Sequence, residues 1–220
     1  MLKPELFAFL RDLKENNNRD WFQENKDRFE EELREPLLHF IREFEPHLAE
    51  ISPYFLALAK KSGGSLFRIY RDVRFGKDKT PYKTNAALHF RHENGKDAHC
   101  PGFYLHLDPN ECFCGAGIWR PDSPSLRSIR EAIVEKPKEW AKVIGNPNFQ
   151  LQGDSLKRAP KGFDPEHPLI EDLKRKDHMA VINLSIKDVM KKNFLDTYVE
   201  HCVQMAPYVE FIARSVGQPF

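Results

Sequence analysis

The chain has 220 residues, of which 40% are hydrophobic and 30% are charged, and its formal net charge is +1. This composition is typical of a soluble globular protein with one domain over residues 1–220, and it excludes a surface that coats nucleic acid electrostatically. No apolar run approaches the roughly 18–20 residues of a membrane span, and the N-terminus lacks the features of a signal peptide. We therefore expect a cytoplasmic protein with reduced cysteines and no membrane partner.

Two helical stretches with regular apolar stripes open the chain, over about residues 3–50. The first covers residues 3–14, where apolar side chains recur three or four positions apart. Asn18 is expected to cap the second stretch, which contains Pro36. Because proline has no backbone N–H and its ring clashes with the preceding turn, we expect this helix to be broken or kinked near Arg34.

A basic segment, LFRIYRDVRFGKDKTPYKT, follows at residues 66–84. It holds six basic side chains against two carboxylates, although the chain as a whole is almost neutral. Its first half alternates as a β-strand does, which predicts a strand over residues 66–75 with Arg71 on the apolar face. The opposite face, which we expect to line a site for an anion, carries Arg68, Tyr70, Asp72 and Arg74.

Three further strands are predicted at residues 83–92, 101–108 and 111–119, and short turns join them into an antiparallel meander. Each of the first two alternates between apolar and polar side chains, so one face of the sheet is expected to pack on helices. If these registers hold, the other face of the sheet carries the polar residues of the basic segment. It also carries His89, Arg91, Tyr104, His106 and Asp108.

The rest of the chain, about residues 123–216, is predicted to be mainly helical. It includes a small hairpin at residues 149–159, a strand at residues 179–185 and a long final helix. The expected fold class is α+β: an antiparallel meander of about five to seven strands, with its core at about residues 65–120, packed against N-terminal and C-terminal helices.

The basic segment has a functional interpretation and a structural one. Guanidinium groups bind phosphate or carboxylate oxygens in bidentate geometry, so Arg68 and Arg74 are expected to hold an anion. The other candidate ligand-binding residues add charge or aromatic rings: Tyr70, Lys77, Lys79, Tyr82, Lys83 and Tyr104. In the structural alternative, Arg71 and Arg74 pair with nearby carboxylates such as Asp72 and Asp78, and Arg71 itself is expected to be structural.

Candidate catalytic residues are Asp72, His89 and His106, because histidine titrates near neutrality and exchanges protons readily. The two histidines with Asp72 and Asp108 also have the chemistry of metal ligands, but no compact ligand spacing is present, so no metal and no cofactor is expected. The cysteine pair at positions 112 and 114 is expected to lie in the core.

Several motifs resemble the signature of a conserved hypothetical family, domain of unknown function 2461. The main motif is RIYRDVRF from Arg68, followed by KDK from Lys77 and PYKT from Pro81. Shorter matches extend to about residue 176: NNRDWF from Asn17, PGFYLH from Pro101, GAGIW from Gly115 and LKRAPKGF from Leu156. The family occurs in bacteria and within longer fungal proteins. The resemblance implies one family-wide domain and an important basic segment, and it brings no activity, cofactor or catalytic residue.

Three hypotheses about function follow. The best-supported is a protein that binds an anionic small molecule with a phosphate or carboxylate group. If the histidines exchange protons with that molecule, the protein is an enzyme acting on a small phosphorylated substrate. The second is a non-catalytic module for a nucleic acid or an acidic protein partner, of which nucleic acid is not favoured. The third is a protein whose arginines only organise its own fold.

Overall fold

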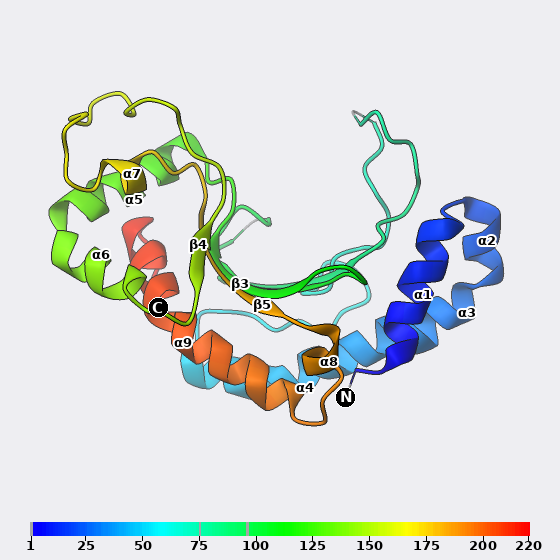
Figure 1. Ribbon diagram of the computed structural model, residues 1–220. Coiled ribbons are helices and arrows are strands. Elements are labelled where there is room, and N and C mark those ends of the chain that lie inside the picture. The colour runs from blue at the N-terminus through cyan, green and yellow to red at the C-terminus, as the bar shows by residue number, and fades with distance from the viewer. Residues whose placement is uncertain (1, 75, 96) are drawn as a thin grey trace.

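The structure is a computed structural model that describes residues 2–74, 76–95 and 97–220 (Figure 1). The N-terminal helical elements are α1 (Pro4–Glu15), α2 (Arg19–Glu24), α3 (Lys26–Arg28), the π-helix η1 (Phe29–Arg34) and α4 (Glu35–Ile51). The strands are β1 (Ala86–Arg91), β2 (Gly102–Leu107), β3 (Cys112–Ile118), β4 (Gln150–Gln152) and β5 (His178–Leu184). The later helices are α5 (Ser123–Glu135), α6 (Pro137–Ile144), α7 (Ile170–Leu173), α8 (Ile186–Val189) and α9 (Phe194–Ser215).

The five strands form one antiparallel sheet in the order β1-β2-β3-β5-β4. Helices α4 and α9 lie beneath it in the view of Figure 1, and the opposite face is open between α1–α2 on one side and the 150–170 region on the other. The predicted α+β class is confirmed, and helices come before and after the sheet along the sequence. The number of strands is at the low end of the predicted range.

The inner face of the sheet packs on α4 and α9 through aromatic rings. Phe90 of β1 lies 4.6 Å from Phe44 of α4, and Phe44 lies 4.9 Å from Tyr198 of α9, both measured between ring centroids. All three are fully buried, as are the alternating residues Phe103 and Leu105 of β2. The strict alternation of β1 and β2 follows from this packing, because one face is in the core and the other is not.

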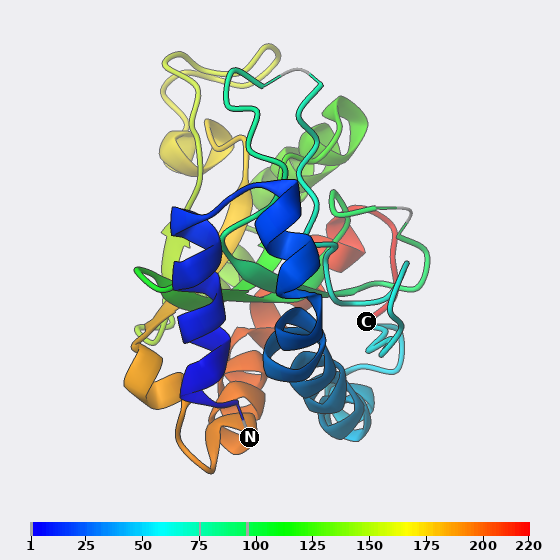
Figure 2. The ribbon, with the colours of Figure 1, turned by 90° about the vertical axis from the view of Figure 1, so that its right-hand side faces the viewer.

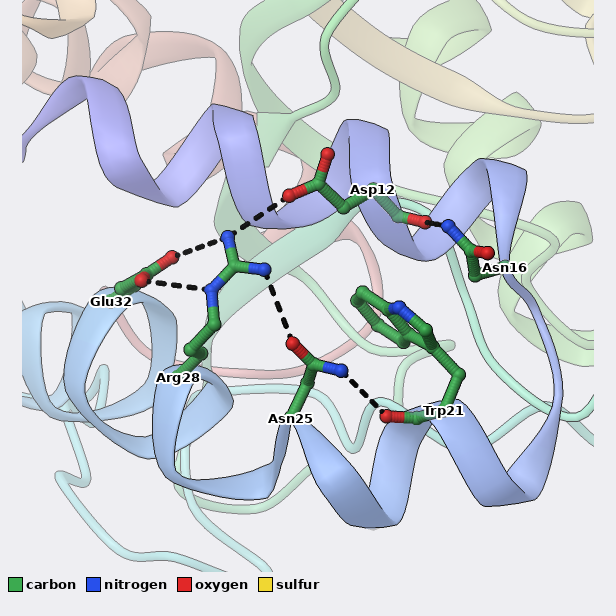
Figure 3. Close-up of polar contacts among 6 residues, drawn as sticks. All are labelled: Asp12, Asn16, Trp21, Asn25, Arg28 and Glu32. Atoms are coloured by element: carbon green, nitrogen blue, oxygen red, sulfur yellow. Dashed lines mark hydrogen bonds and ion pairs between the residues drawn. The ribbon is translucent and has the colours of Figure 1, made fainter.

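The N-terminal helices are joined by a network around Arg28, shown in Figure 3. Its guanidinium donates to Asp12 of α1 at 3.0 Å, to Asn25 at 3.2 Å and to both carboxylate oxygens of Glu32 at 3.0 and 3.2 Å. These bonds raise the pKa of Arg28, with the bond to Glu32 as the largest cause. The network holds α1 beside α2 and η1, which lie next to it in Figure 2.

One of the two predictions about the second helical stretch is confirmed. The side chain of Asn18 accepts a bond of 2.9 Å from the backbone N–H of Trp21, which makes Asn18 the N-cap of α2. The chain is not broken at Arg34, because Arg34 and Glu35 both have right-handed helical backbone angles and the π-helix η1 continues directly into α4, which carries Pro36 in its first turn. A proline there has no N–H to donate to the preceding turn.

The predicted basic strand over residues 66–75 is wrong, and its last residue lies outside the described residues. The segment makes only isolated bridges, Leu66 with Leu88 and Tyr70 with Tyr82. Arg71 N donates to Pro81 O at 2.9 Å, but Pro81 has no N–H to return a bond, so a regular ladder cannot form. The next predicted strand is accordingly shorter and begins at Ala86.

The C-terminal part differs from prediction at one element. The expected hairpin over residues 149–159 does not form: β4 pairs with β5 instead, through Leu151 opposite Ala180. A capping box begins α8, because Ser185 and Asp188 each accept a bond from the other's backbone N–H.

Candidate functional site

A cavity of about 670 Å³ lies on the open face of the sheet, opposite the side that packs on α4 and α9. Most of its strand lining comes from alternate residues of β1, β2 and β3, and Ala116 of β3 and Met179 of β5 add to it. The alternate residues are Ala87, His89, Gly102, Tyr104, His106, Phe113, Gly115 and Gly117. The basic segment and the residues after it close one side, through Phe67, Arg71, Asp72, Lys83, Thr84 and Asn85. The volume is in the range of small-molecule sites.

Strand pairing brings the aromatic and imidazole rings of the pocket into adjacent rows. His89 of β1 lies opposite Tyr104 of β2, and Tyr104 lies opposite Gly115 of β3. In the next row His106 lies opposite Phe113, and these two rings stack with centroids 4.8 Å apart and planes 13° apart. The register therefore produces a pocket with ring-lined walls and a glycine between them.

His89 is a neutral imidazole inside this pocket. It is 9% exposed, and burial lowers its pKa to about 4. Its ring lies parallel to that of Phe67, with planes 5° apart, and its side chain makes no hydrogen bond to any described residue. Gly102 makes this position possible, because a Cβ there would lie 2.3 Å from His89 Nε2. A ligand group that forms a hydrogen bond with this buried imidazole would stabilise it.

His106 and Tyr104 form a hydrogen-bonded pair on β2. Tyr104 Oη lies 3.1 Å from His106 Nδ1, and the amide nitrogen of Asn85 lies 3.5 Å from the same atom. Burial raises the pKa of Tyr104 to about 12 and lowers the pKa of His106, so at neutral pH the phenol is protonated and the imidazole is neutral. Since an amide nitrogen only donates, Nδ1 is the acceptor and the imidazole proton is on Nε2.

The cationic end of the pocket is formed by Lys83 and Arg71. Burial lowers the pKa of Lys83, and the nearby Arg68 lowers it further. Lys83 Nζ lies 5.1 Å from the centre of the Phe67 ring and forms no ion pair with any described residue. Lys83 therefore adds to this end of the pocket a positive charge that no carboxylate of the described residues pairs with.

Two arginines of the basic segment are held by carboxylates. Arg71 pairs with Asp78 and also donates to Thr80 Oγ1 at 2.9 Å, while its side chain lines the pocket. Arg74 donates to Asp72 through Nε at 3.0 Å and a terminal nitrogen at 2.7 Å. This bidentate pair holds the pKa of Asp72 well below its usual range. The ion pairs that the structural alternative expected at Arg71 and Arg74 are therefore present.

Comparison with known proteins identifies the family of the chain. The profile of the conserved hypothetical protein family DUF2461 matches residues 5–211. The chain belongs to the DUF2461 family. No curated protein matches it. In the part of this DUF2461 chain that the structure describes, no helix combines the length and apolar character needed to cross a bilayer.

The pocket of this DUF2461 protein contains part of the predicted site. The predicted residues that line it share the open sheet face or its rim: Asp72, Lys83, His89, Tyr104 and His106. Arg91 and Asp108, which were expected on that same face, are not among the lining residues, nor are the remaining candidates Arg68, Tyr70, Arg74, Lys77, Lys79 and Tyr82. The predicted assignment of faces in the basic segment differs from the pocket lining, because Phe67 and Arg71, which were expected on the apolar face, line the pocket, whereas Arg68 and Tyr70 do not.

The two tyrosines that lie elsewhere pack against the N-terminal helices. Tyr82 is 5% exposed and stacks on Phe22 of α2 with ring centroids 4.0 Å apart. Tyr70 lies next to it, at 5.4 Å, and both line a separate cavity of about 480 Å³ with Arg19. Their packing at the α2 side keeps both rings away from the pocket on the sheet.

Three aromatic residues of the pocket were not predicted: Phe67, Phe113 and Trp119. Phe113 lies between two buried cysteines on β3, so the same alternation that placed Tyr104 would have placed it on the open face. All four cysteines are buried free thiols, as expected for the pair at 112 and 114.

Proposed function

We propose that this DUF2461 protein binds a small molecule with a phosphate or carboxylate group in the pocket on the open face of its sheet. Lys83 is the observation that carries the proposal: it lines the pocket, is close to Arg68, and has no carboxylate partner among the described residues. Removing a cation from water without a counter-ion is unfavourable, and a bound anion would reverse that cost.

Arg71 supports the same conclusion from the other side of the cationic end. Its pairing with Asp78 and Thr80 orients the guanidinium at the pocket rim and uses one of its terminal nitrogens, Nη1. A guanidinium has five N–H donors, so donors remain for an incoming oxygen. This revises the anion site from Arg68 and Arg74 to Lys83 and Arg71, with Arg68 contributing charge from nearby.

The pocket gives less support to acid–base catalysis by its histidines at neutral pH. A general base works best when its pKa is near the working pH, whereas burial lowers the pKa of His89 to about 4. Asp72 is held as a carboxylate by Arg74 and therefore has no proton to donate. Hydrogen bonding to a ligand is the role that a neutral imidazole fulfils best here.

The test is calorimetric titration with inorganic phosphate, sulfate, acetate, mononucleotides and a short single-stranded oligonucleotide, with thermal unfolding in parallel. At least one small anion should bind, and at about 100 times its Kd it should stabilise the fold by about 2.7 kcal/mol. Lys83→Gln should weaken that anion at least about tenfold, which is about 1.4 kcal/mol.

Lys187→Gln is the matched control, because it removes the same charge from an exposed position on α8. The proposal is overturned if no small anion binds, or if the two lysine variants weaken binding equally. Binding of the oligonucleotide alone would favour the nucleic-acid module, and absence of binding by every probe would favour arginines that only organise the fold.

A further inference from the structure

We infer that the anion carries a flat unsaturated ring, which packs over Gly115 against the side chains of Tyr104 and Phe113. The ligand class is thus an aromatic or heteroaromatic phosphate or carboxylate. This inference rests on the proposed function, since it assigns the part of the ligand that lies beyond the cationic end of the pocket.

Gly115 is the only one of three glycines in the pocket whose conformation and surroundings, among the described residues, do not require glycine. At Gly102 a Cβ would lie 2.3 Å from the His89 ring, and at Gly117, where φ is +120°, it would lie 2.1 Å from His178 O. At Gly115 φ is not positive, and the nearest atoms to a Cβ, in Phe113 and Tyr104, lie 3.6 Å away. That spacing is an ordinary van der Waals contact.

Glycine is nevertheless one of the least favourable residues in the interior of a strand. Gly115 lies in the middle of β3, paired with Tyr104 on one side and Val181 on the other. The Cβ that it lacks would point into the pocket between two aromatic side chains. The absent side chain therefore leaves room on the pocket floor, and the fold itself gains nothing from that room.

The walls around Gly115 favour a flat occupant over a branched one. Among the described residues, the rings that line the pocket are Phe67, His89, Tyr104, His106, Phe113 and Trp119. Aromatic faces at van der Waals distance stabilise another ring through offset stacking, beyond what the buried area contributes. Two polar groups complete the wall: the imidazole of His89, which has no hydrogen-bond partner in the described part of the chain, and the Nε2–H of His106. Both suit the edge of a heteroaromatic ring.

Matched pairs of probes test the inference by calorimetry. Phenyl phosphate is compared with cyclohexyl phosphate, and adenosine 5′-monophosphate with ribose 5-phosphate, because each pair shares the anion and differs in the flat ring. In at least one pair the flat member should bind at least about tenfold more tightly to the wild type, which is about 1.4 kcal/mol. Gly115→Val should remove that preference and leave the affinity for inorganic phosphate within about twofold.

Gly115→Ala is the second variant, and thermal unfolding establishes that each variant folds. It should fold at least as stably as the wild type and weaken the flat probe by a smaller factor. Gly76→Ala, in the basic segment outside the pocket, is the control for the substitution itself, since a Cβ there has 3.4 Å of space to its nearest atom.

Two groups of results separate failure of this inference from failure of the proposed function. If inorganic phosphate or another small anion binds but neither pair shows a preference, or if Gly115→Val keeps the preference, the ring inference is overturned and the anion site stands. It is also overturned if Gly115→Ala unfolds the protein, because the glycine would then be required by the fold. If no anion of any kind binds, both are overturned.

Discussion

Lowering the pH from about 7.5 to about 5 should destabilise the fold through two histidines that are buried in the neutral form. His178 of β5 is fully buried beside Trp140, neither ring nitrogen has a hydrogen-bond partner among the described residues, and burial lowers its pKa to about 3. Burial lowers the pKa of His89 to about 4. In the unfolded chain both return to about 6.5, so the unfolded state binds more protons below that pH.

The magnitude follows from the distance between the working pH and the unfolded pKa. Stability is fully present above about pH 6.5 and falls by about 1.4 kcal/mol per pH unit for each histidine below it. At about pH 5 each histidine has removed about 2 kcal/mol, and the two together about 4 kcal/mol, which is a large part of a typical 5–15 kcal/mol. Carboxylates with lowered pKa values, such as Asp78, act below this window because their usual value is 3.8.

Urea denaturation followed by tryptophan fluorescence at both pH values measures the effect. His178→Gln and His89→Gln should each reduce the pH-dependent difference by about 2 kcal/mol, whatever they do to stability at neutral pH. His39→Gln, on the exposed side of α4, is the control and should leave the difference unchanged. If wild-type stability is the same at both pH values, or if His39→Gln has the effect of His178→Gln, the burial of neutral histidines is not what governs acid stability.

Three further outcomes are expected. Tyr82→Ala should lower the free energy of unfolding by about 3 kcal/mol in the same urea assay, because a buried stacked ring is lost. Tyr82→Phe should leave the anion affinity measured by calorimetry unchanged, and weaker anion binding by this variant would return Tyr82 to the site. Arg28→Met should lower the free energy by about 1 kcal/mol, less at high salt, and an unchanged value would show that its half-exposed network does not stabilise the N-terminal helices. The Cys202 thiol, whose pKa burial raises, should react with a thiol reagent only after unfolding, and rapid reaction of the native protein would contradict its burial.

The regular strands were predictable because burial of one sheet face imposes strict alternation. Leu88, Phe90, Phe103 and Leu105 occupy the core, so their neighbours in sequence had to face the other way, and His89 and Tyr104 were placed correctly for that reason. Such placement does not depend on the identity of the polar residue.

The basic segment was misplaced because its alternation is not enforced by a ladder. Between the bridges at Leu66 and Tyr70 only isolated backbone bonds hold the segment, and beyond Tyr70 the bond from Arg71 N to Pro81 O is not returned because Pro81 has no N–H. Nothing in the order of residues indicates that Phe67 turns toward His89, and the pairing of Arg74 with Asp72 followed from the sequence only as one of two alternatives. Those contacts depend on where α2 and the sheet hold the ends of the segment.

Local features that are unfavourable to the fold converge on the pocket. Gly115 is a poor strand residue, the buried imidazole of His89 has no hydrogen-bond partner among the described side chains, and Lys83 is repelled by Arg68 and forms no ion pair with a described carboxylate. Each of the three alone is tolerable, but in a folded domain such conflicts cluster where a ligand resolves them. A ring over Gly115 would fill the floor of the pocket, and its polar edge would hydrogen-bond to His89. The anionic group of the ligand would lie beside Lys83 and Arg71. Under the proposed function, one ligand therefore relieves three separate costs. An anion near His89 would also raise the pKa of His89 from about 4. Binding would then be accompanied by proton uptake and would be tighter at lower pH.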